Sequence, residues 1–419
     1  MCTMIAKEAI SRYTNCNSNV HGVFLDLSKA FDKVEYSKLF RLLLDRSIPP
    51  HVIRILLNIY TGQQVRVMWN GESSHFFPIS NGVNQGAIIS PILFCVYIDT
   101  LLIRLQKNGA GCHIGNLFAA ALAYADDVVL IAPTARAMRS MLTICEKFAN
   151  EFKVTFNAKK TKCITFQFNK TTTNRSLSKE FPPPVFSIDG NNIESVTSWP
   201  HLGHLLDAEL SDDDDIEARR KKFVGQYNNF EYQFSKVDVS VKNALFKTYC
   251  SSHYGAELWN LSNNNIERYC TAWRKAIRKL WKMPRDCSCL NVSAVSNSLP
   301  LFDELCRRVM NFISLCLNCD SEFVRSITSY GIASGMFSPI GQNSLICATR
   351  YRMRVSQISA SKSSTRKHKE LCFKETDCQL LDRANVLREI LLVKDGTLTL
   401  SNQEFNMTDV DEMIQSLAD

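Results

Sequence analysis

The sequence lacks any run of 18 apolar residues, the length that a membrane-spanning helix requires. Its first residues, 1–7, also lack the basic-then-apolar order of a secretory signal peptide. Charged residues make up only 21% of the 419 residues and hydrophobic residues 45%, a balance that excludes a disordered or fibrous chain. We therefore predict an intracellular protein of the nucleus and cytoplasm, with two or three domains and no membrane partner.

A complete zinc-binding pattern is also missing, although the chain holds 16 cysteines. The close pairs are Cys316 with Cys319 and Cys287 with Cys289, and a zinc site needs a second pair at ligand spacing. Without a secretory context, most of the cysteines are expected to be reduced thiols in packed positions. Whether a histidine or another cysteine, such as His253 or Cys306, completes a zinc site stays open.

The net charge of +8 is concentrated in one part of the chain. Residues 217–286 hold 14 Lys and Arg against 6 Asp and Glu, which accounts for the whole excess. Within this part, 266–282 has the pattern of an amphipathic helix with one strongly basic face. Such a surface favours a polyanionic partner, most often nucleic acid, while a solvated helix face is the alternative.

Strand and helix signals alternate along the first 168 residues, whereas the pattern after 211 is helical. Asn70-Gly71 favours a two-residue hairpin turn between 64–69 and 73–79. Further strands are expected at 22–27, 117–123, 128–132 and about 162–168, and helices at 32–46, 50–60, 90–106 and 134–153.

The later part of the chain divides by composition. The polar, proline-ending stretch 169–184 predicts a linker, and short strands are expected in 185–210. The helical region spans 211–320, and 321–419 is poorly defined apart from a helix at about 376–394.

Three acidic residues lie where apolar strands end. Asp26 closes the strand at 22–27, and Asp126 and Asp127 lie in a tight turn between two other apolar strands. Carboxylates in such surroundings are costly to desolvate unless they are paired or bind a cation. Gathered by a sheet, they would suit two Mg²⁺ ions that hold phosphate oxygens, while turn acids facing water remain the alternative on spacing alone.

The sequence segments around these acids resemble those of a known protein family. Five segments occur in order, at 24–32 (FLDLSKAFD), 81–94 (NGVNQG followed by SPILF), 124–127 (YADD), 157–162 (NAKKTK) and 199–205 (WPHLGHL). In chain order, they resemble motifs A, B, C and D and the primer grip of reverse transcriptases. The sequence of motif A has the form found in LINE-type, non-LTR retrotransposons. The resemblance covers about 15–320.

The resemblance implies an α+β fold, in which a polymerase palm (an antiparallel sheet backed by helices) is followed by an all-helical, thumb-like domain. It implies an RNA-directed DNA polymerase that transfers nucleotides from dNTPs to a primer 3′ hydroxyl on an RNA template. Two Mg²⁺ ions are the implied cofactors, with Mn²⁺ as the alternative, and the RNA–DNA hybrid and dNTPs are the implied partners. The oligomeric state is not implied.

Two alternatives to this activity stay open. Residues 1–20 resemble only the last helix of the family's fingers, so we expect an N-terminally truncated product. A catalytically inactive remnant that only binds nucleic acid is therefore one alternative. An RNA-dependent RNA polymerase or maturase-type enzyme is the other, and Phe31 argues against it.

The resemblance also assigns roles to single residues near the carboxylates. Asp26 and Asp126 would hold the metal ions, with Asp127 as a weaker ligand and the carbonyl of Leu27 contributing. Phe31 would be the steric gate that excludes a ribose 2′-hydroxyl. The remaining implied residues are Gln85 and Gly86 at the nucleotide, Lys160 near the departing pyrophosphate, and Leu202 and Gly203 in the primer-grip turn.

The thumb-like region would contact nucleic-acid phosphates through basic side chains, which gives affinity without sequence preference. The residues assigned to this contact are Arg219, Arg220, Lys221, Lys222, Arg274, Lys275, Arg278 and Lys279.

Overall fold

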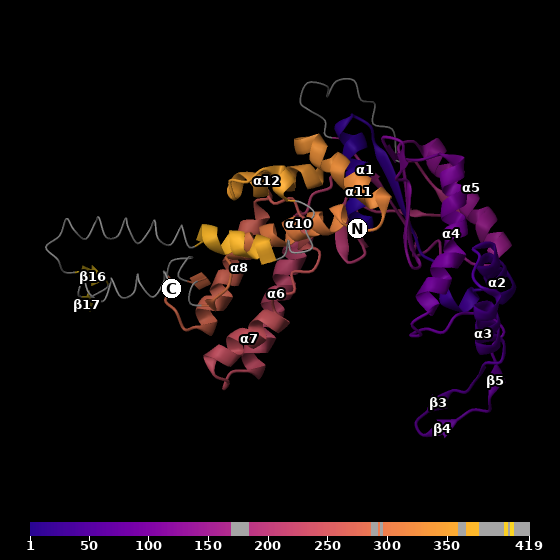
Figure 1. Cartoon of the computed structure of the whole chain (residues 1–419), viewed down its shortest axis with the longest axis horizontal. Coiled ribbons are helices and arrows are strands. Elements are labelled where there is room, and N and C mark those ends of the chain that lie inside the picture. Colours follow the sequence, from indigo (N-terminus) through magenta and orange to yellow (C-terminus); the bar gives the residue numbers. More distant parts are fainter. Residues whose placement is uncertain are drawn as a thin grey trace. The chain divides into compact units, whose positions relative to one another are not determined.

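The computed structural model divides the chain into two compact units, Met1–Ser211 and Asp212–Asp419 (Figure 1). The structure describes residues 1–168, 184–285, 292–293, 296–358 and 366–376, together with the backbone of 398–400 and 403–405. The predicted linker and the predicted helix at 376–394 lie outside the described residues, apart from 184 and 376. Among the described residues, no helix has the length and apolar character needed to cross a membrane.

Five strands form the central sheet of the first unit, in the order β13-β10-β1-β9-β8. β1 (Val20–Leu25) lies between β9 (Asp127–Ala132) and β10 (Lys162–Phe166) and runs antiparallel to both. β8 (Ala121–Tyr124) pairs antiparallel with β9, and β13 (Glu194–Ser195) pairs parallel with β10. The sheet is therefore mostly antiparallel.

Helices cover both faces of this sheet. Successive side chains of a strand point to opposite faces, so a strand that is apolar throughout needs cover on each face. Val23 and Leu25 of β1 belong to the hydrophobic core that the sheet shares with α4 (Ser90–Asn108) and α5 (Ala135–Phe152). Figure 1 shows α1 (Cys2–Asn15) on the other side of the strands from α4 and α5. The predicted palm architecture is confirmed.

The helices that follow β1 differ from the prediction at one point. The single helix expected at 32–46 is instead a short 3-10 turn, η1 (Phe31–Lys33), and a separate helix, α2 (Tyr36–Asp45). The carbonyls of Phe31 and Val34 accept hydrogen bonds from the amides of Val83 (2.8 Å) and Gly82 (2.9 Å). Because a continuous helix would use these carbonyls internally, the contact with the 82–83 segment explains the break.

The other helices of this unit agree with the sequence. α3 (Pro50–Thr61) follows α2, and α4 begins at Ser90 with a proline in its first turn. Thr134 caps α5, since its hydroxyl oxygen accepts a hydrogen bond from the Ala137 amide (3.2 Å).

Two hairpins lie outside the main sheet. β2 (Gln64–Val65) pairs with β5 (Phe77–Pro78), and β3 (Met68–Trp69) pairs with β4 (Glu72–Ser73). The turn residues Asn70 and Gly71 have φ values of 49° and 86°, and two positive φ values are what the predicted type I′ turn requires.

The strand expected at 117–123 is divided between two sheets. β7 (Leu117–Phe118) pairs with β6 (His113–Ile114), whereas β8 joins the main sheet. The chain passes from one sheet to the other at the two residues between β7 and β8. The first of them, Ala119, donates its amide hydrogen to the Cys112 carbonyl (3.0 Å).

The second unit is helical in its described part, apart from the short strands β16 (Leu398–Leu400) and β17 (Gln403–Phe405). Trp259 is fully buried, and its indole N–H donates to the buried carboxylate of Asp215 (2.7 Å). The long helices of this unit are α6 (Asp213–Gln233), α7 (Val239–Tyr249), α8 (Asn265–Leu280), α10 (Leu301–Leu317), α11 (Glu322–Ser334) and α12 (Pro339–Arg350).

Candidate active site

The hairpin of β8 and β9 presents two of the three acidic residues. Tyr124 pairs with Asp127, so that Ala125 and Asp126 form the two-residue turn. Ala125 has a φ of 52°, which permits this tight reversal. Asp126 and Asp127 are exposed, which corrects the expectation of carboxylates held in apolar surroundings. The apolar neighbours supply the strands, while the acids themselves lie beyond the strand ends.

The register of β1 against β9 brings the third acid to the same place. Leu25 pairs with Val128, and the next position of this antiparallel register sets Asp26 opposite Asp127. By alternation, both acids belong to the face that carries Phe24. Burial, and then the charges of Asp126 and Asp26, raise the pKa of the Asp127 carboxyl. Asp126 and Asp26 therefore each lie close enough to Asp127 to repel its charge.

The donor set fits hard divalent cations. Carboxylate and carbonyl oxygens are the ligands that Mg²⁺ prefers, and a bound cation would relieve the repulsion that acts on Asp127. As the side chains stand, no three His, Cys, Asp or Glu groups within the described ranges form a metal site. Binding would therefore require these side chains to change conformation, and Asp126 and Asp127 are exposed.

The backbone of Leu27 leaves a further oxygen for such a cation. Leu27 pairs with Phe156 in an isolated antiparallel bridge. The hydrogen bonds of this bridge are made by the flanking residues, and one of them runs from the Asn157 amide to the Asp26 carbonyl (2.8 Å). The Leu27 carbonyl takes no part in the bridge.

A turn at 157–161 holds Asp26 and Lys160 together. The Asn157 side-chain oxygen accepts hydrogen bonds from the amides of Lys159 (3.2 Å) and Lys160 (3.3 Å). The hydroxyl oxygen of Thr161, which is fully buried, accepts one from the Asp26 amide (3.2 Å). Sequence reasoning missed Thr161, because a threonine among lysines gives no signal of a contact with a distant strand.

These residues surround one small pocket. Its volume is about 220 Å³, and Asp26, Asp127 and Lys160 contribute polar groups to its wall. Trp199 and Leu202 supply part of the apolar wall. An anionic group bound beside Lys160 would therefore lie next to the carboxylates.

The hairpin of β14 (Ser198–His201) and β15 (His204–Asp207) closes the pocket. Its turn residues Leu202 and Gly203 have φ values of 49° and 77°, again a type I′ combination. The structure thus shows the predicted turn at these residues, and their contact with a primer remains a prediction.

The buried ring of His201 connects this hairpin to α1. Its Nδ1 lies 3.1 Å from the Thr3 hydroxyl, and its ring lies 5.7 Å from that of Phe24. Burial, followed by the positive charges of His204 and the N-terminus, lowers the pKa of His201 to about 4. His201 is therefore neutral at pH 7. The sequence placed it in the segment that resembles a primer grip but gave it no role, and it gave no signal for Thr3.

The predicted nucleotide-pocket residues lie on a neighbouring surface. Phe31 is half-buried and stacks on the fully buried Phe94, with ring centroids 4.9 Å apart. Gln85 and Gly86 are exposed, and the Gln85 amide donates a long hydrogen bond to Asp32 (3.4 Å). Gly86 has a φ of 85° and open space around it, so backbone conformation alone explains the glycine.

The basic residues of the second unit differ in their availability. Arg220 forms two hydrogen bonds with Glu217 (both 2.7 Å), and Arg274 pairs with Glu267. Arg219 is half-buried beside Asp215 (3.8 Å), and Arg278 is also half-buried. The exposed members of the set are Lys221, Lys222, Lys275 and Lys279.

The zinc question receives a partial answer. Cys319 donates its S–H to the Cys316 carbonyl (3.2 Å), and His253 Nδ1 lies 2.7 Å from the Tyr269 hydroxyl. No zinc-type cluster occurs in the part of the chain that the structure describes, and Cys287 and Cys289 lie outside it.

Comparison with known proteins agrees with this geometry. Residues 3–208 match the family described as reverse transcriptase (RNA-dependent DNA polymerase). The Pol polyprotein of the type-2 retrotransposable element R2DM of Drosophila melanogaster is 34% identical over 141 residues, which cover 34% of this chain and 13% of that protein. The probable RNA-directed DNA polymerase from the transposon X-element of the same species is 23% identical over 275 residues, covering 63% of this chain and 28% of that protein.

Other similar proteins are more distant or more partial. A type-1 element R2 polyprotein of Popillia japonica is 28% identical over 186 residues, covering 43% of this chain and 30% of that protein. Apo telomerase from Candida tropicalis is 10% identical, with a TM-score of 0.39 over 78% of this chain and 56% of that one, a similarity too low to assign a function. The chain spans less than a third of each of these three curated relatives. Residues 3–208 of this chain are a reverse transcriptase domain of the non-LTR retrotransposon type.

Proposed function

We propose that the chain is an RNA-directed DNA polymerase, which extends a primer 3′ hydroxyl with dNTPs on an RNA template. The observation that carries this proposal is the meeting of Asp26, Asp126 and Asp127 at one edge of an antiparallel sheet. Lys160 lines the adjoining pocket, so its ammonium and the metal-binding carboxylates would both be near the phosphates of a bound dNTP. The family membership of residues 3–208 supports the same activity.

In this proposal Asp26 and Asp126 hold two Mg²⁺ ions, Asp127 is a weaker ligand and the Leu27 carbonyl contributes an oxygen. Bound ions of this kind stabilise the attacking and leaving oxygens of an in-line phosphoryl displacement. The chain's own part is to hold the ligands in place. The hydrogen bonds of Thr161 and Asn157 to the Asp26 backbone serve this purpose.

The incoming nucleotide would lie between Phe31 and Lys160. Phe94 packs against one face of the Phe31 ring and so favours the orientation in which the ring would meet the sugar. Lys160 offsets the negative charge that develops on the departing pyrophosphate, a form of electrostatic catalysis. Gln85 and Gly86 would border the same nucleotide, and the Leu202-Gly203 turn would position the primer end.

The second unit would hold the template–primer hybrid through phosphate contacts. The exposed lysines at 222, 275 and 279 are available for this role, since they lie on the surfaces of α6 and α8. Lys221 is also exposed, but its ammonium lies 3.9 Å from Glu217. Contacts of this kind are salt-dependent and independent of sequence.

Primer extension by the purified chain tests the proposal. An RNA template with a DNA primer, Mg²⁺ and dNTPs should give extension, and Asp126→Asn should abolish it. Asp189→Asn is the matched control, because Asp189 is an exposed turn residue of the same unit with a φ of 49°, which asparagine adopts readily. The control should extend at the wild-type rate.

Two added measurements, hybrid binding and extension in the presence of both dNTPs and rNTPs, separate the two alternatives. Tight binding of the hybrid without extension would contradict polymerase activity and identify a protein that only binds nucleic acid. Extension that prefers rNTPs would contradict the DNA polymerase assignment and favour an RNA polymerase.

A further inference from the structure

The helical unit contains a second pocket, which the polymerase proposal does not use. Its volume is about 510 Å³, and it lies among α7, α8, α10 and the helix of residues 366–376. Its wall combines cationic side chains with aromatic and aliphatic ones. The four cations are Lys247, Arg307, Arg308 and Lys369.

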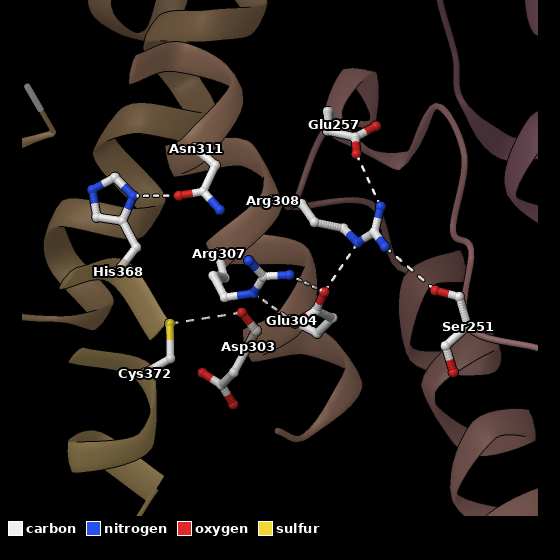
Figure 2. Close-up of polar contacts among 9 residues, drawn as sticks. All are labelled: Ser251, Glu257, Asp303, Glu304, Arg307, Arg308, Asn311, His368 and Cys372. Carbon is white, nitrogen blue, oxygen red and sulfur yellow. Dashed lines mark hydrogen bonds and ion pairs between the residues drawn. The ribbon is translucent and has the colours of Figure 1, made fainter. Parts of the chain in front are cut away.

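The two arginines are already neutralised by neighbouring acids, as Figure 2 shows. Arg307 forms two hydrogen bonds with Glu304 (2.7 and 2.5 Å). Arg308 bonds to Glu304 (3.1 Å), to Glu257 (3.1 Å) and to the Ser251 carbonyl (3.3 Å). Burial acts to raise the pKa of Glu304, yet the hydrogen bond and charge of Arg307 and the charge of Arg308 lower it overall. Glu304 therefore stays ionised, and this network forms a fixed base for the pocket.

The two lysines are left with positive charge in excess. Lys247 donates a hydrogen bond to the Asn297 carbonyl (2.7 Å), and burial, together with the charge of Lys369, lowers its pKa. Within the described ranges, neither lysine forms an ion pair with a carboxylate. Two ammonium groups that repel each other across a pocket are a site for an anion.

The helix that carries Lys369 is attached firmly to α10. His368 Nδ1 lies 2.8 Å from the Asn311 side-chain oxygen, and the Cys372 S–H donates to the Asp303 carbonyl (3.8 Å) (Figure 2). Both His368 and Cys372 are buried. These contacts turn Lys369 and Phe373, one helical turn apart, toward the pocket, and the Lys369 ammonium lies 5.6 Å from the Phe373 ring centre.

The rest of the wall suits a flat, weakly polar group. Trp273, Leu299 and Phe373 contribute apolar surface. The buried His253 is tied to the Tyr269 hydroxyl (2.7 Å), and burial, with the charge of Arg308, lowers its pKa to about 4. It is therefore a neutral hydrogen-bonding group at pH 7, which an uncharged base can meet without an electrostatic penalty.

We propose that this pocket binds a nucleotide, with its phosphate between Lys247 and Lys369 and its base against the apolar wall of Leu299 and Phe373. The ligand chemistry is that of a phosphorylated nucleoside, and it has two sources: a free nucleotide or the 5′-phosphorylated end of a nucleic-acid strand. A simple inorganic anion would use the lysines but not the apolar wall. An acidic peptide without an aromatic side chain would likewise leave the apolar wall unused.

This site is independent of the polymerase site, so the two proposals fail separately. Binding can be measured by isothermal calorimetry on the full chain carrying Asp126→Asn, in which no extension takes place. The probes are AMP, inorganic phosphate, and a six-residue oligothymidylate with and without a 5′-phosphate.

Lys247→Gln and Lys369→Gln should each weaken binding of the phosphorylated probe about tenfold, since each removes a contact with a charged partner. Both lysines are exposed along part of their side chains, so the variants should keep the wild-type melting temperature. Lys367→Gln is the matched control, because Lys367 is an exposed lysine of the same helix that does not line the pocket. The control should bind as the parent chain does.

The probes identify the source of the ligand. Tighter binding of the oligonucleotide with the 5′-phosphate than of the one without it, by a margin that Lys247→Gln and Lys369→Gln remove, supports a strand end. AMP that binds more tightly than inorganic phosphate, while the 5′-phosphate makes no difference to the oligonucleotides, supports a free nucleotide. Oligonucleotide binding that ignores the 5′-phosphate, together with AMP binding that Lys247→Gln and Lys369→Gln leave unchanged, would overturn the proposal. An equal loss of affinity in Lys367→Gln would also overturn it, because that result indicates general charge attraction. So would inorganic phosphate that binds as tightly as AMP, because that result indicates an anion site that makes no contact with a base.

Discussion

Replacing Thr161 by valine would test how the backbone of Asp26 is held in place. The Thr161 hydroxyl oxygen accepts a hydrogen bond from the Asp26 amide (3.2 Å), and the Thr161 side chain has no exposed surface. Valine has almost the same shape as threonine but offers no acceptor. The change therefore removes one hydrogen bond at the carboxylate cluster and leaves the packing nearly unaltered.

The expected loss of stability follows from the burial of the two partners. An amide left without an acceptor in the interior costs about 1–3 kcal/mol, and Asp26 is only half-buried, so we expect about 1–1.5 kcal/mol. In a unit of 211 residues, this loss lowers the melting temperature by roughly 2–6 °C. Since small displacements of a catalytic group cost up to about 100-fold in rate, primer extension should slow by about tenfold or more.

Urea unfolding and single-nucleotide extension are the two measurements. The midpoint should fall while the dependence on urea stays the same, since valine does not change the surface exposed on unfolding. Thr161→Ser is the control, because serine keeps the hydroxyl, and it should recover most of the extension rate. If valine left both stability and rate unchanged while serine behaved alike, the hydrogen bond would have no role in placing Asp26.

Three other predictions concern the same chain. Burial and neighbouring charges raise the pKa of Asp127 in the folded state, so its ionisation costs stability. Without metal, Asp127→Asn should therefore gain unfolding free energy relative to wild type as pH rises from about 3 to 7, measured by urea titration at each pH. Because the group is exposed, the gain should be less than about 1 kcal/mol. Phe31→Val should raise the ratio of rNTP to dNTP incorporation, measured by competition, and an unchanged ratio would reject the gate. Lys275→Gln and Lys279→Gln should each reduce the log–log salt slope of hybrid binding by about 1, whereas Arg274→Gln, already ion-paired, should change it less.

The parts of the fold that were predicted correctly depend on local signals. Asn70-Gly71 specifies its own turn through two positive φ values, and Thr134 caps the helix that follows it. The carboxylate edge was predictable for a similar reason, because Asp26 and the 126–127 turn each follow directly on an apolar strand. Only the register between the strands was needed to bring them together.

The parts that were missed depend on contacts between distant segments. The helix expected at 32–46 is interrupted because Gly82 and Val83 take hydrogen-bond acceptors from its first turn. The acids at 126 and 127 are exposed because they lie past the strands whose apolar residues suggested burial. Neither a propensity nor a period in the sequence records such contacts.

The ion pairs of the basic residues are likewise not predictable from a count of charges in the sequence. A count of charges treats Arg220 and Lys222 alike, yet one is held by Glu217 and the other is exposed. The pairing depends on the side chains that lie three or four positions away on the helix and on those that the fold brings near. A basic stretch therefore predicts the sign of a partner, and the structure decides which side chains are available to it.

The pocket for which we propose a nucleotide extends this argument to a whole site. Lys247 and Lys369 lie far apart in the sequence, and they face one pocket because buried contacts of His368 and Cys372 attach one helix to another. No sequence motif links these residues, so their shared pocket could not be predicted from the sequence. A site made of strand ends can be predicted from sequence because each end is marked locally, whereas a site made of packed helices becomes visible only with its packing. In the two proposals, the lysines on α6 and α8 would contact any phosphate backbone, whereas Lys247 and Lys369 would contact the single phosphate of one nucleotide.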